Sequence, residues 1–428
     1  MLLLFTQENR TMLVQSILKR IQKQPGFVYE HVRWAGPGKE LGLEVRLRAY
    51  KRSLPICSSC FKKCKGYDRL RERRFVFVPL LNIPMNFVYA PRRCACPRCG
   101  VTVEALPWAE GKSRHTTTYL WFLASWAKSL SWTETARRFG SSWAVVFKAV
   151  EMAVIWGRAH ADYRNISSIG VDEFAWKKRH KFLTLVYQID IGMTRLLWMG
   201  ESRKAETFAA FFTWFRDNGS ILKFITSDMW AAFLKVASAH APSAVHVLDR
   251  FHVMALFSKA IDKVRRDDVA KLRKAGDKVT LTNTRWILLK QKRNLTGGQM
   301  ERLGVLLRAN LRVVKMYLLR ESFQKFWDYV SPHWADRFLL SWLREAGRKR
   351  IRPLRTLVKT LTKHRPLLLN WFRAKGAFKK GATEGMNGKA RVTTKRAYGF
   401  KSFRHAEIAL FHALGELPTP DWHTHRFA

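Results

Sequence analysis

The spacing of hydrophobic residues changes several times along this chain of 428 residues. Between residues 53 and 108, short stretches rich in Cys, Pro and Arg predict strands and turns, whereas residues 116–162 predict helices. From Ser167 the pattern becomes typical of strands. After Arg250 it returns to the helical period up to about Lys375, and prolines at three positions break it into separate helices.

Five short stretches between residues 167 and 249 predict consecutive strands of one sheet. A helix is predicted between the third and the fourth, where KAETFAAFFTWFRDNG has the helical period and ends on Gly219. Residues 384–415 return to a helical pattern, while residues 1–50 show only a basic, helix-compatible stretch. The five predicted strands are SSIGVDEF, KFLTLVYQID, TRLLWMG, KFITSD and AVHVLD.

Composition narrows the partners that such a chain can have. The formal net charge is +46 and the pI about 10.7, yet 47% of the residues are hydrophobic and 13% aromatic. A disordered basic tail lacks aromatic residues, so we expect folded domains. A folded protein this positive repels itself unless it works against a polyanion, which favours nucleic acid first and an anionic membrane second.

The positive charge is concentrated in the second half of the chain. Residues 250–380 hold 33 Lys and Arg against 9 Asp and Glu, a net charge of +24. From residue 346 to residue 406 there are 18 Lys and Arg and one carboxylate, Glu384. No apolar run approaches the roughly 20 residues of a membrane span, and the opening MLLLF is too short for a signal peptide. We therefore expect a cytoplasmic, nucleoid-associated protein that does not bind membranes.

Two C-x-x-C pairs predict a zinc site. The stretches ICSSCFKKC and RRCACPRCG supply the pairs, and each pair forms a turn that directs two thiolates to one point. Four cysteine ligands close the coordination sphere, so the predicted Zn²⁺ is structural. Cys64 and Cys94 are left over from this zinc set, and the alternative to a zinc site is a set of small buried thiols. The predicted ligands are Cys57, Cys60, Cys96 and Cys99.

The stretch LSWTETARRFGSSWAVVFKAVEMAV predicts two helices around a tight turn. Ser131 and Glu134 form a capping-box pattern, and Gly140 ends the first helix. This layout is that of a helix-turn-helix, whose second helix enters the major groove. The alternative is an ordinary helical hairpin with an aromatic core. Ser141 or its neighbour can cap the second helix, and the predicted DNA contacts there are Ser141, Trp143 and Lys148.

Asp172 and Asp228 each end a predicted strand, the position where α/β folds place chemistry. Either one alone could merely cap the following helix. Together with the isolated Glu384 they indicate a divalent metal site, because several oxygen ligands in a basic chain would otherwise repel one another and the DNA.

Other residues near these carboxylates are weaker candidates. Asp249 also follows a strand and is the reserve for Asp228. Glu173 points to the opposite face from its neighbour on the strand, and Asp190 is interpreted as a turn residue. His252 either contacts DNA or lies in the core, and the core is favoured for a lone histidine.

Several motifs taken together resemble the DDE transposases of bacterial insertion sequences, specifically the ISL3 family, from about residue 57 to about residue 414. The resemblance implies a ribonuclease-H-like core in which Asp172, Asp228 and Glu384 bind two Mg²⁺ (or Mn²⁺), with separations of 56 and 156 residues. The second separation is long, as an inserted helical domain requires. The motifs are the cysteine pairs with CPRCG, VEALPWA, SWTETARRFGSSWAVV, GVDEFAWKKRHKFLTLVYQID, TSDMW, LDRFHV and TEGMNGKARVTTKRAYGF.

The surroundings of Glu384 add to this interpretation. Asn387 and Arg391 lie three and seven residues further on, on the same face of a helix. A cation there can hold the DNA backbone beside the metals, so the predicted DNA contacts are Lys389, Asn387 and Arg391. Two nearby glycines weaken the helix prediction or let DNA approach the backbone closely.

The expected fold class is therefore multidomain α/β, with a ribonuclease-H-like mixed sheet interrupted by an all-α insertion. The expected activity is that of a transposase that binds the terminal inverted repeats of its insertion sequence, cleaves there and transfers the 3′-OH ends to target DNA. We expect it to act on double-stranded DNA as a homodimer or larger assembly. A catalytically silent DNA-binding regulator and a metal-dependent nuclease are the alternatives. The expected domains are an N-terminal extension (1–50), a four-cysteine zinc module (51–110), a helix-turn-helix segment (111–162) and the catalytic domain (163–428), with the insertion at about 250–380.

Overall fold

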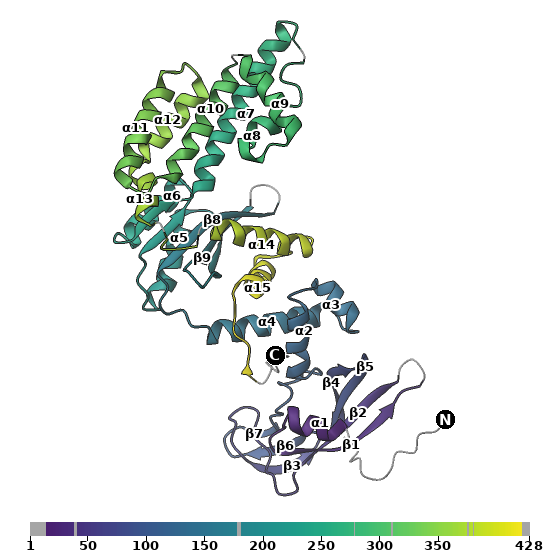
Figure 1. Ribbon diagram of the computed structural model, residues 1–428. Helices are drawn as coiled ribbons and strands as arrows, with labels where there is room; N and C mark the ends of the chain where they lie inside the picture. The colour runs from purple at the N-terminus through teal and green to yellow at the C-terminus, as the bar shows by residue number, and fades with distance from the viewer. Residues whose placement is uncertain are drawn as a thin grey trace, which may run out of the picture. The chain divides into compact units, whose positions relative to one another are not determined.

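The computed structural model describes residues 14–37, 41–177, 181–277, 279–309, 311–374, 376–379 and 381–421. They divide into two compact units, which are described separately (Figure 1). The first contains residues up to 161 together with 411–413 and the stretch from 417 onward. The second contains residues 162–410 and 414–416.

A four-stranded sheet forms the first part of the N-terminal unit. Its order is β1-β2-β5-β4, and helix α1 (Val14–Ile21) packs on β1. Trp108 is buried at its centre and makes edge contacts with Phe27 and Tyr89 at ring-centroid distances of 4.8 and 5.4 Å. Such aromatic pairs stabilise a small core beyond the area they bury. The strands are β1 (Phe27–Ala35), β2 (Gly42–Ala49), β4 (Arg73–Leu80) and β5 (Ile83–Tyr89).

Strands β1 and β2 lie in the range where the sequence indicated little beyond a helix. The predicted basic start is present as α1, but the hairpin after it was not predicted. In β2 the buried Leu43, Val45 and Leu47 alternate with charged residues, which is the strand period. Glu44 is also buried on this strand, where it pairs with Arg33 at 2.8 Å. The charged positions therefore belong to the sheet rather than to a loop.

A second, three-stranded sheet carries the cysteines. Its order is β3-β6-β7, with both pairings antiparallel. The strands are β3 (Lys65–Arg69), β6 (Arg92–Cys96) and β7 (Gly100–Val103).

Three helices complete the N-terminal unit: α2 (Thr117–Trp126), α3 (Trp132–Arg138) and α4 (Trp143–His160). The capping box predicted at Ser131 and Glu134 is present and opens α3. Gly140 has φ +57° in the turn that follows, a conformation that favours glycine. Ser142, rather than Ser141, caps α4 through a hydrogen bond from the Val145 N–H. Helices α3 and α4 are bent by 115° relative to each other.

The end of the described chain returns to α4. The Arg158 guanidinium lies 4.2 Å from the centre of the Phe411 ring. At Gly157, an added Cβ would lie only 2.7 Å from the Leu417 side chain. Only a residue without a side chain fits there, so this segment belongs to the packing of the N-terminal unit.

The second unit is built on a five-stranded sheet of order β10-β9-β8-β11-β12. Strand β9 pairs antiparallel with both β8 and β10, and β8, β11 and β12 run parallel. All five predicted strands and the helix after the third are confirmed. The elements are β8 (Ser168–Lys177), β9 (Lys181–Gln188), β10 (Arg195–Glu201), α5 (Ala205–Arg216), β11 (Phe224–Ser227), α6 (Ala231–His240) and β12 (Val245–Leu248).

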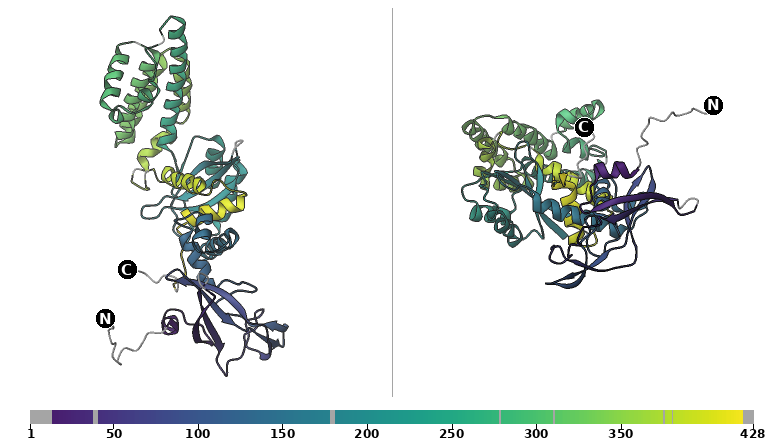
Figure 2. Two further views of the ribbon diagram at one scale, coloured as in Figure 1. Left: turned by 90° about the vertical axis from the view of Figure 1, so that its right-hand side faces the viewer. Right: turned by 90° about the horizontal axis from the view of Figure 1, so that it is seen from below.

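Helices cover both faces of this sheet. Ile169 and Val171 on β8 point to one face, where they pack in one core with Phe208 and Phe233 of α5 and α6. The alternate residues of β8 point to the other face, against which helix α14 (Ala382–Arg396) lies (Figures 1 and 2). Both glycines within α14 are accommodated without breaking it.

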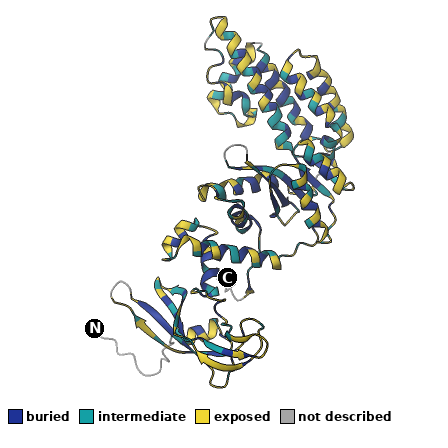
Figure 3. Cartoon of the chain, turned by 180° about the vertical axis from the view of Figure 1, so that it is seen from behind, coloured by how far each residue is buried: buried dark blue, intermediate teal, exposed yellow. Residues whose placement is uncertain are grey.

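The segment between β12 and α14 is helical, as predicted. The helices bury one apolar face each and expose the other (Figure 3). Helix α13 packs on β12, which attaches the bundle to the edge of the sheet. The bundle consists of α7 (Arg250–Lys274), α8 (Arg285–Leu289), α9 (Gly297–Arg308), α10 (Arg312–Gln324), α11 (Pro332–Arg348), α12 (Arg352–Lys363) and α13 (Arg365–Arg373), with 3-10 turns at Lys292–Asn294 and Lys325–Asp328. After α14 comes α15 (Phe403–Leu414).

Among the described residues, no single helix is both long and apolar enough to cross a membrane. The bent pair α3 and α4 meets that criterion by length and composition alone.

Candidate functional site

Strand register brings three carboxylates into one row. Thr226 of β11 pairs with Gly170 of β8, and Ser227 pairs with Leu248 of β12. If the first register is continued by two residues and the second by one, Asp228 lies opposite Asp172 on one side and opposite Asp249 on the other. Neighbouring strands lie about 4.8 Å apart, so the three side chains stand side by side across β8, β11 and β12.

Burial and mutual repulsion perturb these carboxylates. The pKa of Asp172 is raised to about 6, first by burial and further by Asp228 and Asp249, while His252 opposes the shift. Burial also raises the pKa of Asp228, against a hydrogen bond from the Trp230 N–H. Carboxylates that share one site in this way gain from a bound cation.

His252 lies against the carboxylate row. Its Nε2 is 3.7 Å from Asp172 Oδ1, and its Nδ1 is 3.5 Å from Asp249 Oδ2. The contact with Asp249 is the largest cause that raises the pKa of His252 to about 9, and burial opposes the shift. The prediction that this histidine is a core residue does not describe its position, since 38% of the side chain is exposed. The i,i+3 spacing of Asp249 and His252 at the start of α7 was the signal in the sequence that could have predicted their contact.

Helix α14 reaches the row through Asn387 rather than through Glu384. The Asn387 amide donates from Nδ2 to Asp172 Oδ2 and accepts at Oδ1 from the Tyr187 hydroxyl at 2.7 Å. Glu384 lies one turn earlier, is exposed, and has no ion pair within the described residues. One helical turn corresponds to about 5 Å along the axis, so Glu384 lies on the turn next to the one that contacts Asp172.

Within the part of the chain that the structure describes, no closed set of carboxylate ligands surrounds Asp172. Among the described residues, the set of Cys57, Cys60, Cys96 and Cys99 is the one whose ligand atoms lie within 4.8 Å of one another. The chemistry of the acidic cluster nevertheless fits a hard divalent cation, because carboxylate oxygens are the ligands such ions prefer.

The two weaker acidic candidates have other partners. Glu173 points away from its neighbour Asp172 and lies 3.5 Å from Arg203, whose guanidinium also stacks on Phe182 and Trp230. Asp190 accepts hydrogen bonds from Ser167 and Gln188, both at 2.7 Å. These contacts give Asp190 a structural role just after the C-terminal end of β9, in agreement with its interpretation as a turn residue.

The predicted DNA contacts differ in exposure. Asn387 is only 2% exposed and both ends of its amide have protein partners, so it is not carried forward as a DNA contact. Ser141 is half-buried. Trp143, Lys148, Lys389 and Arg391 are exposed.

The four predicted zinc ligands converge. Cys60 and Cys96 have their sulfur atoms 3.6 Å apart, close to the roughly 3.8 Å edge of a tetrahedron with Zn–S bonds of about 2.3 Å. The pKa of Cys57 is lowered to about 6, first by a hydrogen bond from the Thr102 hydroxyl and then by backbone N–H groups. Thiolate character of this kind suits a metal ligand. Cys64 and Cys94 are buried beside the set but outside it.

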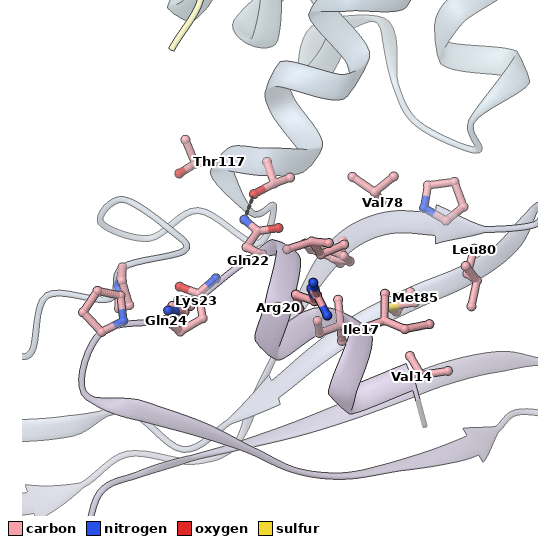
Figure 4. Close-up of a pocket in the computed structure, with 17 residues that line it drawn as sticks. Val14, Ile17, Arg20, Gln22, Lys23, Gln24, Val78, Leu80, Met85 and Thr117 are labelled. Carbon is pink, nitrogen blue, oxygen red and sulfur yellow. Dashed lines mark hydrogen bonds between the residues drawn. The ribbon is translucent and has the colours of Figure 1, made fainter. Parts of the chain in front are cut away.

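A pocket of about 820 Å³ lies elsewhere in the N-terminal unit, between α1 and strands β4 and β5 (Figure 4). Its lining is mainly apolar and includes Ile17, Val78 and Met85. Its described lining contains no carboxylate, in contrast to the acidic cluster.

Comparison with known proteins identifies the family. A family model described as "Transposase", that of the ISL3-type DDE transposases, matches residues 169–410. The transposase of insertion sequence IS1001 from Bordetella parapertussis is 28% identical over 396 residues, which cover 91% of this chain and 96% of that protein. The transposase of IS1557 from Mycobacterium tuberculosis is 27% identical over 426 residues, covering 91% and 93%.

Among solved structures, the Drosophila P element transposase strand transfer complex covers 69% of this chain and 92% of its own, with 8% identity and a TM-score of 0.40. That similarity is too low to support any argument. The family match spans more than half of the chain, and on that ground the protein belongs to the ISL3 family of insertion-sequence transposases.

Proposed function

We propose that this protein cuts DNA at the terminal inverted repeats of its own insertion sequence and joins the freed 3′-hydroxyls to target DNA. The observation that carries the proposal is the carboxylate row of Asp172, Asp228 and Asp249, created by the register of three adjacent strands. The order and directions of the five strands support a ribonuclease-H-like core as the scaffold.

Asp172, Asp228 and Glu384 are the proposed ligands of two Mg²⁺ ions. When bound, such ions stabilise the attacking and leaving oxygens of a phosphodiester displacement. Asp172 and Asp228 are fixed by the sheet, whereas Glu384 stands on the first turn of α14, exposed and unpaired within the described residues. His252 holds Asp172 and Asp249 by ion pairs and offsets part of the negative charge of the row.

The N-terminal unit is the proposed reader of the element ends. The turn between α3 and α4 contains Gly140, and the 115° bend falls within the range of about 90–120° found in helix-turn-helix motifs. Trp143 and Lys148 are exposed on α4, the helix that such a motif places in the major groove. A Zn²⁺ ion held by the four cysteines would fix the three-stranded sheet beside it.

The helical insertion is the proposed platform for the DNA backbone. On α12 the cations Arg352, Arg355, Lys359 and Lys363 are all exposed and have no carboxylate partner within the described residues. Their spacing of three, four and four residues places them in one stripe on the helix. Elsewhere in the bundle, cations such as Arg265 are held by acidic partners, whereas the four cations of the stripe are available to phosphate.

Replacement of the proposed metal ligands tests the function. Glu384→Gln keeps the size but removes the charge that a divalent ion requires, so cleavage of element-end DNA in Mg²⁺ should fall by several orders of magnitude. DNA binding in a gel-shift assay should survive. Asp172→Asn and Asp228→Asn should behave alike, and pairs should cost little more than singles because the ligands act as a unit. Asp190→Asn is the matched control and should be mild.

The same assay separates the alternatives. A silent regulator binds the element ends but never cleaves them, and a nuclease cleaves without producing joined strands. Near-normal cleavage by Glu384→Gln would show that the glutamate is structural and that the proposed ligand set is wrong.

A further inference from the structure

Two contacts fix helix α14 on β8, and they lie about one helical turn apart. Residues 170 and 172 point to the same face of the strand, and residues 383 and 387 lie one above the other on the helix. An added Cβ at Gly170 would lie 2.1 Å from the Thr383 hydroxyl, so the absence of a side chain there admits the helix. The second contact is the hydrogen bond between Asn387 and Asp172. Together they fix both the height and the rotation of α14.

The direction of the Asn387 amide is set by Tyr187. Tyr187 pairs with Gly170 across β8 and β9 and therefore points to the face that α14 covers. Its hydroxyl must donate to Asn387 Oδ1, since that oxygen carries no hydrogen. The N–H end of the amide is then directed at Asp172 Oδ2. Tyr187 is fully buried and Asn387 is 2% exposed, so water cannot replace either bond.

These bonds also determine how Asp172 can bind a cation. Its Oδ1 accepts from the Glu173 N–H at 2.7 Å, and its Oδ2 accepts from Asn387. Hydrogen bonds therefore hold both oxygens of the Asp172 carboxylate, and the lone pairs that remain free point in a fixed direction.

We propose that Tyr187 and Asn387 are positioning residues for the metal site, because they orient Asp172 and fix the helix that carries Glu384 beside it. Neither touches the reacting DNA. This inference rests on the proposed function, since it assigns to Asp172 and Glu384 the role of metal ligands.

Tyr187→Phe in the full-length protein tests the inference, because it removes one hydroxyl and little else. Partners of this kind typically contribute about 10–100-fold to metal affinity. We expect Mn²⁺ binding, measured by electron paramagnetic resonance without DNA, to weaken by roughly that factor in both Tyr187→Phe and Asn387→Ala. The double variant should lose no more than Asn387→Ala alone, since the two bonds act in series.

Tyr317→Phe is the matched control. Tyr317 is 1% exposed, and its hydroxyl has no hydrogen-bond partner within the described residues. It should bind Mn²⁺ as the wild type does. Cleavage by Tyr187→Phe should recover partly at high Mn²⁺ concentration, which a defect of folding alone would not produce.

Two outcomes are distinguishable. If Tyr187→Phe and Asn387→Ala are folded and bind Mn²⁺ like the wild type while Glu384→Gln fails to cleave, the positioning role is wrong and the proposed function stands. If Glu384→Gln cleaves normally, the proposed ligand set itself fails, whatever the other variants do.

Discussion

The salt dependence of DNA binding offers a quantitative test of the basic stripe on α12. The perturbation is the replacement by Gln of the four exposed cations from Arg352 to Lys363, which span about 16 Å of helix. The substitutions leave the buried face of α12 (Leu354, Leu357 and Leu361) untouched, so the fold should be retained.

The magnitude follows from the number of contacts. Each phosphate contact contributes about 0.9 to the slope of log affinity against log salt concentration, so four contacts contribute about 3.6. Between about 50 and 200 mM salt, the wild type should therefore lose roughly 150-fold more affinity than the fourfold variant. Fluorescence anisotropy with duplex DNA, repeated across that range, measures both slopes.

A matched pair of double variants controls for simple loss of charge. Arg352→Gln with Arg355→Gln should lower the slope by about 1.8. Arg265→Gln with Arg312→Gln removes the same charge, but these side chains are held by Asp262 and Asp268 at 3.0 and 2.6 Å. That pair should lower the melting temperature and leave the slope nearly unchanged. Equal slopes in the wild type and the fourfold variant, or an equal decrease in both double variants, would refute the assignment of the stripe.

Three further predictions concern stability. Purified protein should contain about one zinc per chain by metal analysis, and Cys57→Ser should lose that zinc and unfold the N-terminal module while sparing the core; a folded zinc-free module would contradict this. Ser131→Ala should destabilise the N-terminal unit by about 1 kcal/mol in urea unfolding, because it removes the cap that the Glu134 N–H uses, and an unchanged midpoint would argue against the cap. Burial lowers the pKa of His246 to about 4, so below pH 6.5 this histidine takes up a proton in the unfolded chain but stays neutral in the folded one. The free energy of unfolding should therefore fall by up to about 3 kcal/mol between pH 6.5 and pH 4, and the fall should be shallower in His246→Gln.

The sequence was sufficient for the elements from residue 53 onward, though not for β1 and β2, and for two of the three carboxylates in the row. Asp172 and Asp228 were found because each ends an apolar strand, a local signal. Asp249 was only a reserve, and the contact between His252 and Asp172 was not predicted, because both depend on the register of β8, β11 and β12. Register is a property of two strands that are 17 residues or more apart in sequence, and one strand alone does not specify it.

The predicted role of Asn387 differs from the structure for another reason. Its helical spacing from Glu384 was identified correctly, but the helix face was assigned to DNA. The structure turns Asn387 inward, while Glu384 and Arg391 stay exposed, because Gly170 leaves room for α14 to lie directly on β8. A glycine within a strand is a weak signal, and the residue it admits lies more than 200 positions away. The cluster of four cysteines, in contrast, followed from spacing alone, since each C-x-x-C pair forms its own turn.

The packing of Leu417 against Gly157 has a consequence for synthesis of the protein. The N-terminal unit, proposed above to read DNA, lacks its last segment until about 250 further residues have been translated. At roughly 5–20 residues per second, this takes on the order of 12–50 s after residue 161 has been added. A ribosome that stops early therefore releases a chain whose α4 lacks its partner. A fragment that ends at residue 161 inherits the same defect, and one that carries residues 411–421 on a short linker should not.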